Sequence, residues 1–164
     1  MNYITKDYAV QVLAGLAVLE NTEENVLPVI PTRYKTEVSD YVNNKSEEVL
    51  EYIRSKKWEE IKKARNDAET SGCPFKDKVL DSDQRSVTKI NVMIEAAKQV
   101  GDSFQIDWTM QDNSVLTLSY EDALSIPLIL AQYSNLLHEK ARTYRDQIYS
   151  ETDIKNILNI KWEN

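Results

Sequence analysis

A long amphipathic helix in the C-terminal part constrains this chain more than any other feature. Apolar or small residues recur there at 4-3-4-3-4 spacing: Leu130, Ser134, Leu137, Ala141, Tyr144 and Ile148. This spacing places them in one stripe along a helix. Ser119 is expected to cap the helix, with Asp122 at the capping-box position. Pro127 is expected to kink the early part of the helix or to delay its regular start.

Two other stretches towards the ends of the chain carry helical patterns. One extends from Thr36 to about Glu69, and Ser71-Gly72 is expected to stop it. Its apolar stripe is interrupted by Lys57 and consists of Leu50, Ile53, Ile61, Ala64 and Ala68. A stripe this narrow suits a coiled-coil-like contact, including one between subunits. A short final helix is expected to begin with a cap at Thr152, and Trp162 is expected to pack as a terminal plug.

A short strand and a helix are predicted between these elements. The strand covers Phe75 to Leu80, and Asp81-Ser82-Asp83 is expected to supply the N-cap oxygens of the helix, with Gln84 in capping-box spacing from Asp81. The helix carries an apolar stripe and ends at Gly101, a residue suited to a helix C-terminus. The stripe consists of Val87, Ile90, Ile94 and Ala97.

A β-hairpin is predicted after this helix. Residues 104–110 alternate between apolar and polar side chains, and residues 114–119 do so more briefly. The polar turn Gln111-Asp112-Asn113 lies between them, and Asn and Asp tolerate the left-handed conformation that such turns need. The predicted fold class is therefore α+β and mostly α, with long helices and a small antiparallel β-sheet in the C-terminal half, made of this hairpin and the one short strand.

The predicted domain organisation has two parts. Residues 1–70 hold N-terminal helices and a Pro-containing arm for attachment or oligomerisation, and residues 71–164 form the α+β domain. The apolar run Ala9 to Leu19 is too short to cross a bilayer and lacks the flanks of an export signal, so a buried helix is expected, with a membrane-lying segment as the alternative. Pro28 and Pro31 block a continuous helix through residues 21–34.

The composition excludes several kinds of chemistry. A net charge of −7 over 164 residues disfavours binding to nucleic-acid phosphates, and three glycines leave little material for phosphate-binding loops. Cys73 is the only cysteine and His138 the only histidine, which excludes an intramolecular disulfide and most zinc sites. No cofactor, metal, nucleic acid or membrane is expected as a partner.

Three weaker chemical alternatives remain open. Cys73 could act as a catalytic thiol only if it met His138. Paired carboxylates could hydrolyse glycosides if set at the right separation in a cleft. These pairs are Asp81 with Asp83, Asp107 with Asp112, and Glu121 with Asp122. The D-S-D-Q segment at Asp81 opens like a calcium loop but lacks the glycine and the distal glutamate, so only a weak cation site is conceivable.

Four sequence strings stand out in the region from residue 58 onwards. They are W-E-E-I-K-K-A-R-N-D at 58–67, V-L-D-S-D-Q-R-S at 79–86, I-D-W-T-M-Q-D-N-S-V-L-T-L at 106–118 and L-H-E-K-A-R at 137–142. Together they resemble a phage tail-associated domain of unknown function found in tail-fibre and tail proteins. The resemblance covers about residues 58–150 and carries no known catalytic residues. Its signature residues here are Trp58, Asp81, Asp83, Arg85, Asp107, Trp108, Asp112, Asn113, Leu137 and His138. They are interpreted as determinants of a fold, with Trp108 and Val115 on facing strands.

This resemblance implies a non-enzymatic structural component of a phage tail (fibre, baseplate or collar-associated) that acts through protein–protein contacts. The implied partners are other phage tail proteins and further copies of the chain, in a trimer or a higher ring. The implied location is the virion tail, after synthesis in the host cytoplasm. Two alternatives are a tail-fibre assembly chaperone and a carboxylate-based hydrolase using Asp81, Asp107 and Asp112.

Overall fold

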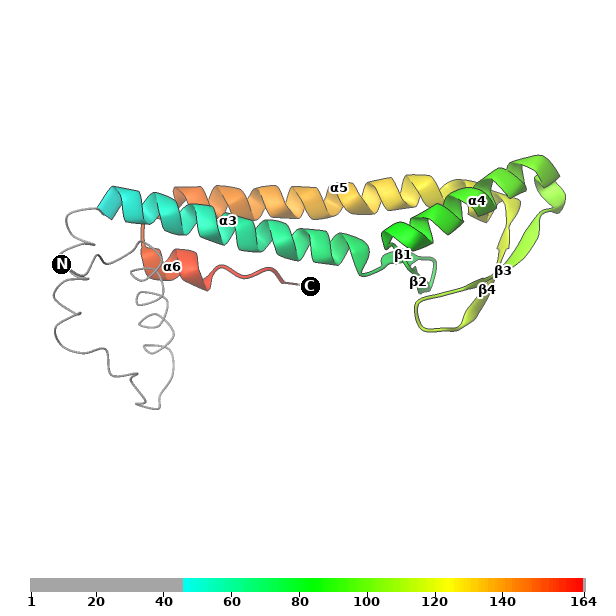
Figure 1. Ribbon diagram of the computed structural model, residues 1–164, viewed down its shortest axis with the longest axis horizontal. Coiled ribbons are helices and arrows are strands. Elements are labelled where there is room, and N and C mark those ends of the chain that lie inside the picture. Colours follow the sequence, from blue (N-terminus) through cyan, green and yellow to red (C-terminus); the bar gives the residue numbers. More distant parts are fainter. Residues whose placement is uncertain (1–45, 164) are drawn as a thin grey trace. The chain divides into compact units, whose positions relative to one another are not determined.

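The structure, a computed structural model, describes residues 46–163 (Figure 1). Helices dominate and two short antiparallel hairpins accompany them, which confirms the predicted α+β, mostly helical class. The predicted helix at 9–19 and the Pro-containing arm at 21–34 lie outside the described residues. The elements are α3 (Ser46–Thr70), β1 (Cys73–Phe75), β2 (Lys78–Leu80), α4 (Gln84–Val100), the 3-10 helix η1 (Gly101–Ser103), β3 (Gln105–Thr109), β4 (Val115–Ser119), α5 (Tyr120–Ser150) and α6 (Ile154–Asn159).

The described residues belong to two compact units, each of which is considered by itself. One contains residues 46–61 and 143–163, and the other contains residues 62–142. Helices α3 and α5 each contribute one part to each unit. The division predicted between residues 70 and 71 concerns the whole chain and stays a prediction.

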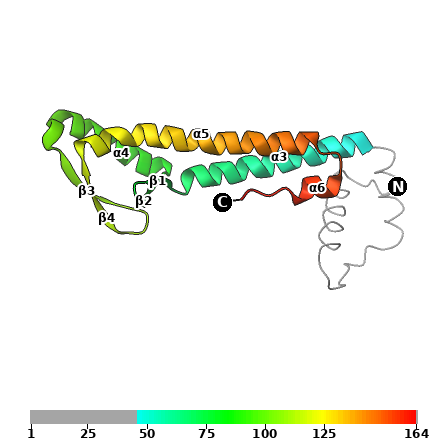
Figure 2. The same ribbon diagram turned by 180° about the vertical axis from the view of Figure 1, so that it is seen from behind.

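The 62–142 unit holds both hairpins. In β1–β2, Cys73 lies opposite Leu80 and Phe75 opposite Lys78. In β3–β4, Gln105 lies opposite Ser119 and Thr109 opposite Val115. Both hairpins lie on the same side of α4 when the molecule is seen from the front and from behind (Figures 1 and 2). The single small sheet of the prediction is therefore replaced by two separate two-stranded sheets.

The strand predicted from Phe75 to Leu80 is wrong because the chain reverses inside it. Lys76 has a positive φ of 55° and, with Asp77, forms the turn between β1 and β2. Each strand has three residues, too few for alternation of side chains to indicate where one strand ends and the next begins.

One apolar core joins α4 to the hairpins and to the first turns of α5. Its buried residues are Phe75, Leu80, Ile90, Met93, Ile94, Ala97, Phe104, Met110, Leu118, Ala123 and Ile126. Trp108 and Leu116 pack against it and lie opposite each other in the ladder. Trp108 and Val115 lie on facing strands as predicted, but Val115 does not anchor the hairpin on α4: it lies opposite Thr109 and points to the other face, where it is 59% exposed.

The two ends of α4 follow elementary capping chemistry, with one correction. The N-cap comes from the predicted segment and is Asp83, whose side chain accepts hydrogen bonds from the backbone N–H groups of Arg85 and Ser86. Asp83 takes this role because it directly precedes the first helical residue, Gln84. The capping-box pairing of Asp81 with Gln84 is therefore wrong. Gly101 ends the helix as predicted, with φ of 74° and its N–H donated to the carbonyl of Ala97.

The start of α5 confirms the predicted capping box. Ser119 N–H donates to the Asp122 carboxylate at 3.1 Å, and Asp122 N–H donates to the Ser119 hydroxyl at 3.2 Å. The helix begins at Tyr120 and contains Pro127, so the expectation that Pro127 delays its start is wrong. The capping box satisfies the first turn before the proline is reached. The predicted stripe is confirmed by the buried Leu137, Ala141 and Ile148.

The other unit buries one row of α3 at every fourth residue. Val49, Ile53, Lys57 and Ile61 are all buried, whereas Leu50, expected in this row, is only half-buried. Lys57 keeps its charge paired in this buried position through Glu60, whose carboxylate lies 2.6 Å from its Nζ. Such a partner offsets part of the cost of removing a charged group from water.

The turn between α5 and α6 closes the same unit with polar contacts. Arg54 donates from Nη2 to the carbonyl of Glu151 at 2.6 Å, and the Glu151 carboxylate accepts from the N–H groups of Thr152 and Asp153 at 2.8 Å each. The N-cap of α6 is Asp153 and not the predicted Thr152, because Asp153 directly precedes the helix. The predicted packing role of Trp162 is supported by its ring contact with Tyr144, at 5.6 Å between centroids.

Within residues 46–163, none of the helices combines the length and the apolar character that crossing a membrane requires.

Gly72 makes the sharpest steric demand of the fold and generates a prediction. It has φ of 130°, and an added Cβ would lie 2.6 Å from Val79 Cγ1 and 2.7 Å from Gln111 Nε2. We expect Gly72→Ala to lower the free energy of unfolding by roughly 2–4 kcal/mol, because backbone strain and overpacking add. Urea unfolding at neutral pH measures this.

Gly101→Ala is the matched control for this prediction. Gly101 also has a positive φ, 74°, but open space surrounds its Cβ position. Its substitution should therefore cost about 1–3 kcal/mol, the backbone strain alone, and less than the substitution of Gly72. Equal losses for the two variants would contradict the steric role of Gly72.

Candidate functional site

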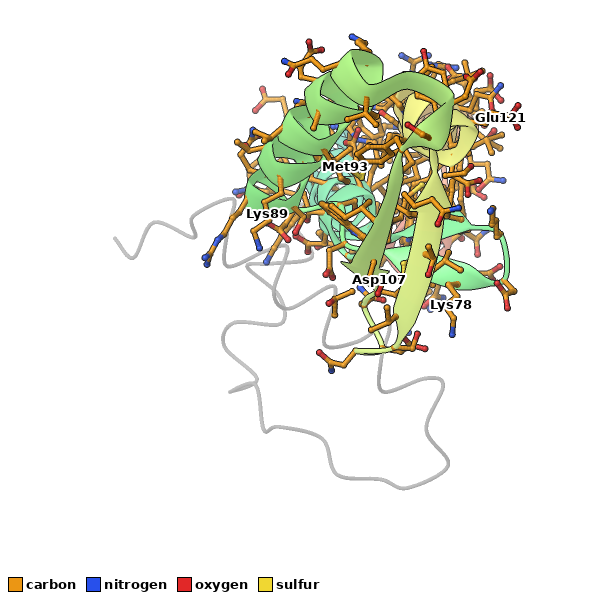
Figure 3. The ribbon with its side chains drawn as sticks, turned by 90° about the vertical axis from the view of Figure 1, so that its right-hand side faces the viewer. Lys78, Lys89, Met93, Asp107 and Glu121 are labelled. Atoms are coloured by element: carbon orange, nitrogen blue, oxygen red, sulfur yellow. The ribbon has the colours of Figure 1, made fainter. Side chains whose placement is uncertain are left out.

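A groove of about 380 Å³ runs beside β3 in the 62–142 unit. The start of α4 and the segment before it supply one side, and β3 with its following turn supplies the other. Lys89 on α4 and Asp107 on β3 mark these two sides in Figure 3. The lining residues are Asp81, Ser86, Lys89, Ile106, Asp107, Trp108, Thr109, Met110, Gln111 and Asn113.

The groove gathers part of the predicted signature set. Asp81, Asp107, Trp108 and Asn113 line it. Three further signature residues lie in the adjoining cap and turn; they are Asp83, Arg85 and Asp112. The last three do not line the groove: Trp58 belongs to the 46–61 part of the other unit, and Leu137 and His138 lie on α5. Two of the four strings thus meet at one place, which their separation in the sequence does not reveal.

The α4 side of the groove is held by the Asp83 cap. Ser86 Oγ donates to the Asp83 carboxylate at 2.7 Å, and the Ser86 N–H donates to it at 3.1 Å. The hydroxyl of Ser86 and then its backbone N–H are the main causes that lower the pKa of Asp83. The ionised carboxylate therefore fixes Ser86, a lining residue, at the edge of the groove.

The hairpin side is held by an equivalent set of bonds in the turn. Asp112 accepts from the hydroxyl of Ser114 at 2.5 Å and from its N–H at 2.9 Å, and these bonds lower the pKa of Asp112. Asn113 has φ of 62°, the left-handed conformation that the sequence predicts for this turn. Its N–H donates to the carbonyl of Met110 at 2.9 Å. Together with the bonds to Asp112, this bond holds the turn in a single conformation.

Trp108 connects the groove to the core. It is half-buried, packs against the apolar cluster and lies opposite Leu116. Asp107, its neighbour, is exposed on the opposite face of the sheet and accepts a hydrogen bond from the Thr117 hydroxyl at 2.6 Å. The groove thus combines an anchored aromatic ring with exposed polar groups.

A serine, a histidine and an acidic residue, the residue types of a serine hydrolase, lie close together elsewhere in this unit, but their hydrogen bonds differ from those of a catalytic triad. Ser134 on α5 donates its hydroxyl to the Glu69 carboxylate, and His138 Nε2 lies 3.9 Å from the other oxygen of that carboxylate. A nucleophilic serine requires its hydroxyl to be paired with the base. Here the serine proton is directed to Glu69, and the cluster joins the end of α3 to α5.

Cys73 occupies a fully buried position at the start of β1. Burial raises the pKa of the Cys73 thiol, so less of the thiolate is present at neutral pH. Its Sγ lies 3.6 Å from the carbonyl oxygen of Pro74. The environment is that of a packed side chain and not of an activated nucleophile.

Four of the six acidic residues in the pairs named from the sequence accept local hydrogen bonds. Asp83 and Asp112 serve the α4 cap and the hairpin turn, Asp122 serves the α5 cap, and Asp107 bonds Thr117. Among residues 46–163, His, Cys, Asp and Glu side chains do not assemble into any group of three or more that could hold a metal ion.

Two exposed apolar rows were missed by the sequence analysis. On α5, Leu128 and Leu136 lie about two turns apart and are 62% and 61% exposed; these two residues form the α5 row. On α4, Val92 and Val100 are exposed. The sequence shows these residues as apolar positions eight residues apart on the two predicted helices, outside the apolar stripes predicted to be buried. A long helix with one buried stripe and a second apolar row offers that row to a partner.

The comparisons with known proteins give one match. A family model with the description "Domain of unknown function (DUF4376)" matches residues 52–161, which is more than half of the chain. Neither the curated proteins nor the solved structures include one that matches this chain.

The Asp83 cap generates a pH prediction. Its pKa is lower in the folded chain than the ordinary 3.8, so its contribution to stability is present above the ordinary pKa and is lost as the pH falls through the lowered pKa. Asp83→Asn keeps a capping oxygen but cannot titrate. We expect this variant to be less stable than the parent near pH 7, where the carboxylate is ionised, and to lose less stability on acidification below about pH 4, so that the two converge in acid. Urea midpoints from pH 7 to pH 2 measure the difference.

Asp83→Ala is the comparison variant, since it removes the capping oxygen and should be less stable at pH 7 as well. The prediction fails if Asp83→Asn loses as much stability on acidification as the parent.

Proposed function

The chain belongs to the DUF4376 family of domains of unknown function, and from the resemblance of its four sequence strings we propose that it is a non-enzymatic structural component of a phage tail. It acts through protein–protein contacts with other phage tail proteins and with further copies of itself. Its place is the virion tail, as part of a fibre, a baseplate or a collar. The connection to phage tails comes from the resemblance of the four sequence strings described above.

The exposed apolar row on α5 is the observation that carries the proposal. Leu128 and Leu136 expose most of their surface although the same helix buries Leu137, Ala141 and Ile148 on its other side. Each large side chain moved from water into an interface contributes about 1.5–3 kcal/mol. A row of such residues on a long helix supports binding to another helix or subunit.

The use of polar residues supports the same proposal. The carboxylate oxygens of Asp83, Asp112 and Asp122 accept hydrogen bonds in two helix caps and a turn. Carboxylates bonded in caps and turns fix where helices begin and where the chain reverses. This favours the interpretation of the signature strings as determinants of a fold.

The proposal is tested on purified phage particles from a producing strain that encodes this chain. Mass spectrometry of mature particles should find the protein at a constant ratio to known tail proteins. Its absence from mature particles would contradict the proposal. Absence combined with a higher yield of soluble tail fibre on co-expression would indicate the assembly chaperone instead.

The α5 row gives a sharper prediction. We expect the double variant Leu128→Ser with Leu136→Ser to keep the thermal stability of the parent, because both side chains are exposed, and to be incorporated into particles at least about tenfold less. Gln147→Ser, an exposed polar change on the same helix, is the control and should be incorporated normally. Normal incorporation of the double variant would exclude this row as the contact.

A further inference from the structure

The outer edge of β3 carries backbone groups that the hairpin does not use. Met110 N–H donates to the Ser114 carbonyl at 2.8 Å, which sets the hydrogen-bonding phase of the ladder. In an antiparallel ladder, hydrogen-bonded pairs alternate with pairs that are not hydrogen-bonded. The bonded pairs before Met110 and Ser114 are therefore Trp108 with Leu116 and Ile106 with Leu118. Asp107 and Thr109 therefore direct their N–H and C=O groups away from β4.

Among residues 46–163 no backbone bond to this edge at Asp107 or Thr109 is present, and the edge lies along the groove. Every residue from Ile106 to Gln111 lines the groove, and Ser86 and Lys89 of α4 line the side that faces it. Just beyond the strand, Gln111 N–H donates to the Val79 carbonyl at 3.0 Å, so β2 pairs with the edge only after the end of β3. A strand edge facing a helix across a groove is the arrangement in which a domain can accept an extended peptide as an additional strand.

The charges of the groove indicate the kind of peptide. Asp81 and Asp107 line it, and within residues 46–163 neither carboxylate has a Lys or Arg within ion-pair distance. Lys89 is the one basic residue among the lining side chains of this groove. The excess of carboxylates favours an incoming segment with a basic side chain.

We propose that the groove between β3 and α4 binds an extended peptide segment of a partner protein, with a Lys or Arg side chain, by β-strand addition to the edge at Asp107 and Thr109. The backbone of the segment pairs with these two residues, and its basic side chain meets Asp107 or Asp81. This inference rests on the proposed function, because it names the chemistry of one protein partner of the same module.

A second copy of β3 is a poorer occupant of this edge. Antiparallel pairing of two β3 strands about a two-fold axis centred near Asp107 or Trp108 sets the two Asp107 carboxylates opposite or diagonal to each other on one face. Like charges at such positions are destabilising. The occupant is therefore a different, basic segment.

The test uses the full chain and a defined peptide, acetyl-(Val-Lys)3-Val-amide, which favours an extended conformation. In an NMR titration, the largest amide shift changes should occur at Asp107 and Thr109 and in the lining residues of α4. The same peptide with N-methyl groups on alternate residues should bind at least about tenfold more weakly, because it cannot pair with the edge. Replacing Lys by Glu should also weaken binding by about tenfold.

A pair of matched variants locates the edge. Thr109→Pro removes an N–H that the ladder does not use and should weaken the Kd for the Val-Lys peptide by about tenfold or more. Val115→Pro removes the equivalent N–H on the outer edge of β4, directly opposite Thr109, and should leave the Kd unchanged. If either proline variant fails to fold, the N-methylated peptide on the parent chain decides the question.

Several results would overturn the inference. They are no binding of the Val-Lys peptide at millimolar concentration, equal binding of the N-methylated peptide, or shift changes confined to β4 or to α5. Peptide-independent dimerisation with shift changes at Asp107 would assign the edge to a second copy and also overturn it. These outcomes are separable from those of particle mass spectrometry, since a chain can be present in the tail without using this edge.

Discussion

Two-stranded sheets expose too much of their surface to be stable alone in water, so both hairpins depend on the apolar face of α4. Ile90, Met93, Ile94 and Ala97 of α4 share one core with Phe75 and Leu80 of the first hairpin and with Met110 and Leu118 of the second. The bond from Gln111 N–H to the Val79 carbonyl links the two hairpins directly. The two sides of the groove are consequently held by the same core. A change in the packing of α4 therefore affects the position of both sides.

This dependence explains how a strand edge can remain available for binding. An exposed edge is a hazard for aggregation, and short length and charge limit that hazard. β3 has five residues, and Asp107 places a carboxylate at its middle. The helix α4 borders the same edge across the groove. An edge protected in this way suits selective addition of one strand, while the leucine row on α5 suits packing against a helix.

Local patterns were sufficient to predict much of the fold. The helix ending at Gly101, the β3–β4 hairpin with its Asn113 turn and the Ser119–Asp122 capping box all depend on neighbours in sequence, and all are confirmed. The exact caps, Asp83 and Asp153, were not predicted, because several candidate oxygens precede each helix. The β1–β2 hairpin was missed because three-residue strands carry no usable period.

The sequence by itself determined the helical class, the long stripe of α5 and the turn chemistry, since hydrophobic period and capping act within a few residues of one another. Only the tertiary structure decided which apolar rows remain exposed. It also decided that Lys57 is buried beside Glu60, and that Asp81, Asp107, Trp108 and Asn113 line one groove. These properties arise from packing between segments distant in the chain, and burial depends on what covers a residue as well as on its own character.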